Sequence, residues 1–221
     1  LYSTFGQSFE KFSYQLGARL ESFDIDAEVN GENVFSDDYV TLYPSGFFNY
    51  TPNEKNSYQV SYSRRIDRPS LRQVSPVREV STPTITVVGN PNLQPQFTNS
   101  VEFNYTRKLK NGSFTGGVFF RNINDNINQL INEDPSDPAS LIISYSNFDD
   151  TNAYGFELSS NYKFTDWWSA NGSFELYQQT QSGIVGTSEV EVDNTVYTAR
   201  VNNSFTVTED LTLQLFGFYR G

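Results

Sequence analysis

Most of the chain alternates between apolar and polar side chains with a period of two residues. Phe12, Tyr14 and Leu16, for example, alternate with Ser13 and Gln15. The same pattern occupies residues 58–62, 97–105, 154–162, 168–176 and 197–205, and weaker versions occupy residues 40–50, 113–121 and 211–220. A period of two is typical of a β-strand with one apolar and one polar face. Since no stretch has the 3.6-residue period of a helix, the pattern predicts about nine strands, or ten if residues 1–6 end an earlier one, and almost no helix.

The connections between the predicted strands alternate between short turns and long loops. The short turns fall near residues 51–56, 108–112, 164–166 and 207–210, and the long loops near residues 22–38, 67–96, 122–152 and 178–194. Strands of about ten residues in this rhythm, with aromatic side chains beside the short turns, are typical of a transmembrane β-barrel. We therefore expect an all-β antiparallel up-and-down meander, with residues 1–221 forming one partial transmembrane β-barrel domain. The alternative is a soluble β-sandwich, whose strands are usually shorter.

The alternation also predicts the surroundings of individual side chains. The apolar set should face lipid, and it contains Phe103, Tyr105, Phe156, Leu158, Phe174 and Leu176. The polar set should face the lumen, and it contains Glu102, Glu157, Asn161, Glu175 and Arg200. Because the pattern still alternates where the chain ends, we expect open edges at the first and last strands and further strands beyond this sequence.

The amino-acid composition excludes most of the common catalytic mechanisms. The chain has neither His nor Cys, so a Ser-His-Asp triad, a His-ligated zinc site and a thiol nucleophile are excluded. A net charge of −11 argues against nucleic acid as a partner, because phosphate recognition needs a basic face. We therefore expect no enzyme activity and no cofactor or metal in a catalytic role.

Two segments resemble a known family. Residues 61–70 (SYSRRIDRPS) are followed by residues 89–95 (GNPNLQP), and residues 153–158 (AYGFEL) add a weaker match. This combination is similar to the barrel of TonB-dependent outer-membrane receptors, and more narrowly to the outer membrane protein beta-barrel family common in Bacteroidota. The resemblance implies a barrel of about 22 strands, of which this chain supplies about ten, closed around an N-terminal plug domain.

The function implied by the resemblance is uptake of a scarce substrate, such as a siderophore, an oligosaccharide or a peptide, across the bacterial outer membrane. Its partners would be outer-membrane lipid, the substrate, and TonB acting through a plug region that these residues do not contain. The alternative is a structural or adhesion barrel without transport. Upstream sequence with a plug and a TonB box would favour transport.

The connection at residues 67–96 carries the candidate site residues. Arg65, Arg68 and Arg72 cluster at its start, and guanidinium groups suit recognition of carboxylate or phosphate. They would bind an anionic ligand at the barrel mouth, or pair with lumen acids or the plug. Its prolines and the apolar residues 85–88 predict an ordered segment that folds inward or over the mouth.

Acidic residues gather in the other predicted long loops. Residues 22–38 and 122–152 contain many carboxylates and no Lys or Arg, and residues 178–194 add further acids. Calcium prefers such oxygen ligands, but no EF-hand spacing is present. Solvated acidic loops are the simpler interpretation.

Overall fold

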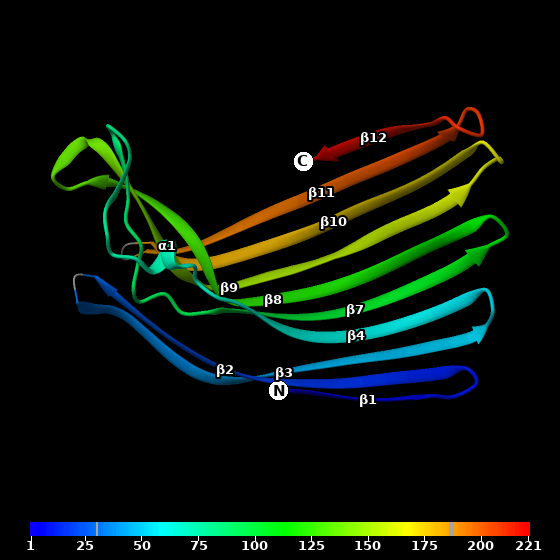
Figure 1. Cartoon of the computed structure of the whole chain (residues 1–221), viewed down its shortest axis with the longest axis horizontal. Helices are drawn as coiled ribbons and strands as arrows, with labels where there is room; N and C mark the ends of the chain where they lie inside the picture. Colours follow the sequence, from blue (N-terminus) through cyan, green and yellow to red (C-terminus); the bar gives the residue numbers. More distant parts are fainter. Residues whose placement is uncertain (30, 186–187) are drawn as a thin grey trace.

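The computed structural model describes residues 1–29, 31–185 and 188–221, and it contains one curved sheet (Figure 1). Ten strands follow one another as sheet neighbours in the order β1-β2-β3-β4-β7-β8-β9-β10-β11-β12. Their bounds are β1 Tyr2–Ser8, β2 Phe12–Val29, β3 Glu32–Asn53, β4 Asn56–Asp67, β7 Gln96–Leu109, β8 Gly112–Asp134, β9 Asp137–Lys163, β10 Trp168–Val185, β11 Ser188–Thr206 and β12 Thr212–Arg220. Every neighbouring pair in this order is antiparallel, so the predicted meander is confirmed.

The two outermost strands of the described sheet lie far apart. β1 and β12 stand at opposite ends of the strand order, and Figure 1 shows them on opposite sides of the molecule. Each is paired along one edge, β1 with β2 and β12 with β11. The predicted open sheet is therefore present in the described part of the chain.

The strand register collects the apolar side chains on one face. The row Val60, Phe103, Val118, Phe156 and Leu176 consists of directly opposed residues on five successive strands. Four of them are at least 37 % exposed, and no second layer of the described chain covers them. An exposed apolar surface of this size needs an apolar environment, as the predicted contact with lipid provides. The residues predicted to face the lumen share the opposite face.

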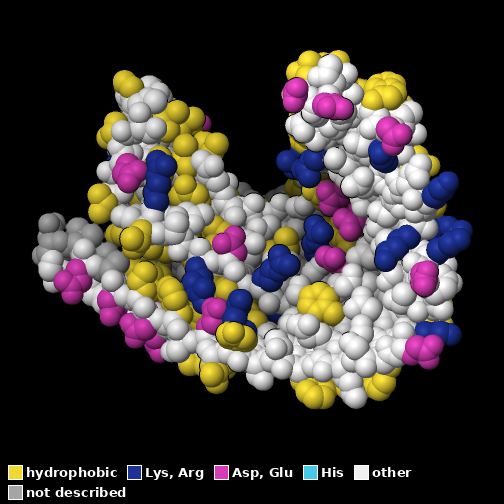
Figure 2. All heavy atoms as spheres, turned by 45° about the vertical axis from the view of Figure 1, so that its right-hand side comes forward, with side chains coloured by type: hydrophobic (Ala, Val, Ile, Leu, Met, Phe, Trp, Pro, Cys, Tyr) yellow, Lys and Arg dark blue, Asp and Glu magenta, His cyan; other side chains and the backbone are white. Residues whose placement is uncertain are grey.

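That opposite, polar face is concave. The rings of Phe119 on β8 and Tyr177 on β10 approach to 6.1 Å although β9 lies between their strands. Gly155 is the residue of β9 paired with both, and a Cβ there would meet the Tyr177 side chain. Gly155 therefore leaves the space in which the two rings meet on this face. Figure 2 shows a broad hollow with charged side chains along its walls.

Aromatic side chains line one end of the sheet, beside the short turns. The rings of Tyr58 and Tyr105 are 4.9 Å apart, and those of Phe164 and Trp168 are 4.2 Å apart. Trp168 also stacks near Phe205 on the next strand, at 6.2 Å. This is the predicted girdle, which suits a membrane–water interface.

Three of the four predicted long loops are not loops. Nearly all of residues 22–38, 122–152 and 178–194 lie in extensions of β2–β3, β8–β9 and β10–β11; residues 30, 186 and 187 lie outside the described part. The expectation was wrong because the alternation of apolar and polar side chains weakens in these acidic segments although the strand pairing continues through them. In an extended hairpin the partner strand still forms hydrogen bonds with the backbone N–H and C=O groups, so both faces of the hairpin can carry polar side chains.

The fourth connection, residues 68–95, is irregular but ordered. It contains the short helix α1 (Leu71–Val74) and the strands β5 (Glu79–Thr82) and β6 (Ile85–Val87). β5 pairs with β6, and β6 adds in parallel to the edge of β9 at residues 141–143. Val74 and Leu93 are buried within it. No helix in the described residues is long and apolar enough to cross a membrane.

The segment GNPNLQP holds this connection against β9. The Asn90 amide donates to the Tyr145 carbonyl at 3.0 Å, and the Gln94 N–H donates to the Asn147 side-chain oxygen at 2.8 Å. A Cβ on Gly89 would collide with carbonyls at the end of α1, so glycine permits the close approach. Residues 89–95, one of the segments that carried the family resemblance, therefore hold the connection against the β8–β9 hairpin.

Candidate functional site

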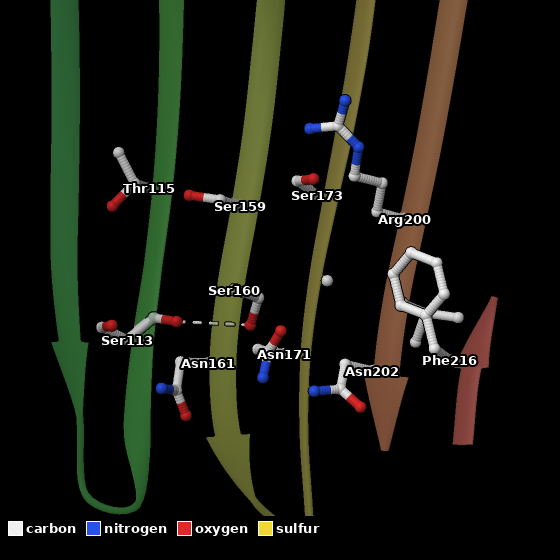
Figure 3. Close-up of a pocket in the computed structure, with 12 residues that line it drawn as sticks. Ser113, Thr115, Ser159, Ser160, Asn161, Asn171, Ser173, Arg200, Asn202 and Phe216 are labelled. Atoms are coloured by element: carbon white, nitrogen blue, oxygen red, sulfur yellow. Dashed lines mark hydrogen bonds between the residues drawn. The ribbon is translucent and has the colours of Figure 1, made fainter. Parts of the chain in front are cut away.

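The concave face is the candidate site, and one part of it is rich in hydroxyl and amide groups. A shallow hollow of about 440 Å³ crosses β8 to β12 (Figure 3). Its polar lining includes Thr115, Ser159, Asn171, Ser173 and Asn202, with Arg200 above them. Such groups donate and accept hydrogen bonds without a fixed charge, so this wall suits passage of a polar solute.

A second part of the concave face is a charged cluster around Arg121. Its guanidinium lies 3.9 Å from Glu102 and 3.9 Å from Glu175, on strands at either side. Glu157 is directly opposite Glu175. Arg121 also stacks over Phe119, with its guanidinium carbon 4.2 Å from the ring centroid. Three carboxylates thus surround one arginine, which leaves the cluster acidic.

A third part lies where β3 and β4 separate. Their pairing ends at Ser45 opposite Ser63, and beyond this point β3 continues with β2 while β4 continues with β7. Pro44, which has no N–H to donate, adjoins the last pair. A hollow of about 350 Å³ occupies the fork. We call it the fork pocket, and its polar lining includes Arg19, Tyr43, Ser45, Ser63 and Arg65.

The three arginines predicted as ligand-binding residues have different surroundings. Arg68 donates to Glu21 at 2.6 Å and to the Tyr39 hydroxyl at 2.7 Å. Arg72 pairs with Glu79 at 3.1 Å, within the connection itself. Arg65 is exposed at the fork pocket. The structure therefore does not gather them into one site.

The sequence analysis did not single out Arg19 or Tyr43. Arg19 could have been identified from the sequence, because the alternation in residues 12–20 places it on the polar face. Tyr43 could not have been identified in this way. Its position opposite Arg19 depends on the register of β3 against β2, and its place in the fork pocket depends on the divergence of β3 from β4.

Carboxylates of the extended hairpins serve local structure. Asp134 accepts from the Ser136 hydroxyl and N–H, and Arg78 lies 3.2 Å away. Hydrogen bonds from Ser136, followed by the charge of Arg78, hold the pKa of Asp134 below its usual value. Within the described residues, no group of three or more carboxylates is arranged to hold a metal ion.

A sequence comparison decides the family. The model of the outer membrane protein beta-barrel family matches residues 1–221. The chain belongs to this family. Its location is therefore the bacterial outer membrane, and the convex apolar face of this outer-membrane barrel chain is the lipid-facing surface. The family is one of barrels, not of enzymes. No curated protein sequence matches the chain.

Solved structures with the same fold are receptors and transporters. The siderophore receptor PirA from Pseudomonas aeruginosa matches with a TM-score of 0.62 and 16 % identity, over 96 % of this chain and 43 % of PirA. The copper transporter OprC matches with a TM-score of 0.61 and 11 % identity, over 97 % of this chain and 41 % of OprC. The predicted relation to the barrels of such receptors is confirmed at the level of fold. The outer-membrane chain spans about two fifths of their length.

Proposed function

We propose that this chain is the barrel segment of a TonB-dependent receptor that imports a scarce substrate, such as a siderophore, an oligosaccharide or a peptide. The observation that carries the proposal is the division of one curved sheet into an apolar convex face and a polar concave face in a chain of this family. The concave face would form part of the wall of the uptake path. An origin in Bacteroidota stays a prediction.

The proposed partners follow from the two faces. Outer-membrane lipid contacts the convex face, and the substrate passes the concave one. TonB would act through a plug region outside these residues. The receptors with the same fold are named for siderophores, iron and copper, which supports a small, scarce cargo.

Uptake by intact cells tests the proposal. The gene for the full-length protein is deleted, and growth is followed on limiting ferric siderophores, oligosaccharides and peptides, with and without functional TonB. We expect a growth defect on one substrate class, restored by the wild-type gene only when TonB is functional. Normal growth on every class, together with lost adhesion, would instead favour an adhesion barrel.

A further inference from the structure

The fork pocket contains a buried polar group without a partner. The Tyr43 side chain is 4 % exposed, and its hydroxyl has no hydrogen-bond partner among the described residues. A buried hydroxyl without a hydrogen-bond partner is energetically unfavourable. A site that retains such a group is arranged for something that completes its hydrogen bonding.

The charges around this hydroxyl are predominantly positive. Arg19 and Arg68 both bind Glu21, at 2.9 Å and 2.6 Å. Arg65 has no ion-pair partner in the described part of the chain. Arg19, Arg64 and Arg65 line the fork pocket and no carboxylate does, which leaves a local excess of positive charge in a chain whose net charge is −11.

The geometry of the fork keeps these groups available. Because β3 and β4 are unpaired above Ser45 and Ser63, no continuous strand pairing closes the wall there. Arg19 retains 52 % exposure of its side chain although it is paired, and its guanidinium lies 5.0 Å from the centre of the Tyr43 ring. Arg65 lines the same hollow from β4.

We propose that the fork pocket binds an anionic group, a carboxylate or a phosphate, carried by the solute that the receptor imports. Tyr43 donates a hydrogen bond to the anion, and Arg65 and Arg19 supply the charge. Arg68 positions Glu21 and the β2–β3 hairpin without touching the anion. The inference rests on the proposed function, because the anion is assigned to a transported solute.

Chemical modification tests the site without transport. The full-length receptor in outer-membrane vesicles is treated with phenylglyoxal, which reacts with accessible arginine, and modified residues are identified by mass spectrometry. Citrate is the carboxylate probe, pyrophosphate is the phosphate probe, and glucose is the neutral control. We expect citrate or pyrophosphate to slow modification of Arg65 and Arg19 at least fivefold, with Arg72 unaffected; the probe that protects at lower concentration identifies the anion class.

Three variants separate binding from folding. Arg65→Gln should raise the anion concentration that half-protects Arg19 at least tenfold. Tyr43→Phe should raise it severalfold without lowering thermal stability, because it removes only an unpartnered hydroxyl. Arg72→Gln is the matched control and should change nothing.

Results that would overturn the anion site can be distinguished from results that would overturn the proposed uptake function. Equal protection of Arg72, absence of protection by either anion, or an unchanged response in Tyr43→Phe and Arg65→Gln would overturn the site. Arg65 that never reacts would show that the polypeptide filling the barrel occupies the pocket, which also overturns it. TonB-dependent uptake that persists in any of these cases leaves the proposed function standing.

Discussion

At the scale of single residues, Gly155 leaves space on the concave face of the wall. It lies between Phe119 and Tyr177, whose rings meet above it on the concave face. Any side chain at this position would enter the space that the two rings share. The glycine therefore allows a contact between strands that are not neighbours.

Gly155→Ala should lower the stability of the full-length protein by about 1–3 kcal/mol, since a Cβ there meets the Tyr177 side chain and the Leu176 carbonyl. Gly172→Ala on the next strand is the matched control, because its Cβ would make only ordinary contact with the Arg200 carbonyl. Urea unfolding in lipid vesicles measures both. Equal midpoints for the two variants would contradict this account of the ring contact.

Asp134 gives the tip of the β8–β9 hairpin a pH dependence. Its pKa is lowered by Ser136 and then Arg78, so its stabilising contribution is present above the ordinary carboxyl pKa of about 3.9 and is lost as the pH falls through the lowered value. Asp134→Asn should therefore lower the thermal midpoint equally at pH 7 and pH 5. The difference from wild type should shrink only below about pH 3.9. Shrinkage already between pH 7 and pH 5 would refute the assignment.

Asp37 should behave in the opposite way. Burial, and then the charge of Asp38, raise its pKa, so its ionised form destabilises the β2–β3 extension at neutral pH. Asp37→Asn should raise the thermal midpoint at pH 7, and this gain should begin to shrink as the pH falls through the raised pKa and be gone below the ordinary carboxyl pKa of about 3.9. The same series of thermal scans tests it, and a lowered midpoint at pH 7 would count against it.

At the scale of elements, the connection at residues 68–95 joins two separate hairpins. Arg68 attaches it to β2 and β3, while β6, Asn90 and Gln94 attach it to β9. The two hairpins belong to opposite sides of the fork. The connection therefore acts as a brace between parts of the sheet that no longer pair directly.

Removing one end of this brace should loosen the β2–β3 hairpin. Arg68→Gln loses the charged hydrogen bond to Glu21, which is stronger than a hydrogen bond between neutral groups. We expect faster cleavage within residues 22–38 by a protease added to intact cells. Arg72→Gln, which breaks only the exposed pair with Glu79, should leave the rate unchanged. An equal increase in both variants would mean that Arg68 is not the anchor.

The sequence predicted the strands and their faces better than it predicted the loops. Turns such as Asn111–Gly112 carry local turn chemistry, and alternation assigns faces without knowledge of partners. The sequence analysis did not predict that β8 extends through residues 122–134. Asparagine side chains there form hydrogen bonds with the neighbouring strand, as Asn122 does with Asn152 at 2.9 Å. Such pairing depends on register, which a single sequence does not reveal. Tyr43 escaped the site prediction for the same reason.

At the scale of the whole molecule, the convex face should tolerate no charge near the middle of the bilayer. Phe156→Arg is expected to destabilise the barrel by roughly 2–4 kcal/mol if the side chain lies near the middle of the bilayer, since Phe156 belongs to the exposed apolar row with Val118 and Leu176. Ser159→Arg on the same strand faces the concave side and should cost little. Urea unfolding in lipid vesicles compares them. Similar losses in both would show that the face assignment is wrong.

The length of the β8–β9 hairpin places part of this outer-membrane barrel well outside the cell surface. A strand crosses the bilayer in about 9–11 residues, whereas β8 has 23 and β9 has 27. At about 3.3 Å per residue, some 40 Å of hairpin projects outward, up to its curved tip at residues 135–136. Antibodies and bacteriophage tail fibres approaching an intact bacterium would meet this tip before the barrel wall. A short epitope inserted there would be displayed to them without altering any membrane-spanning strand.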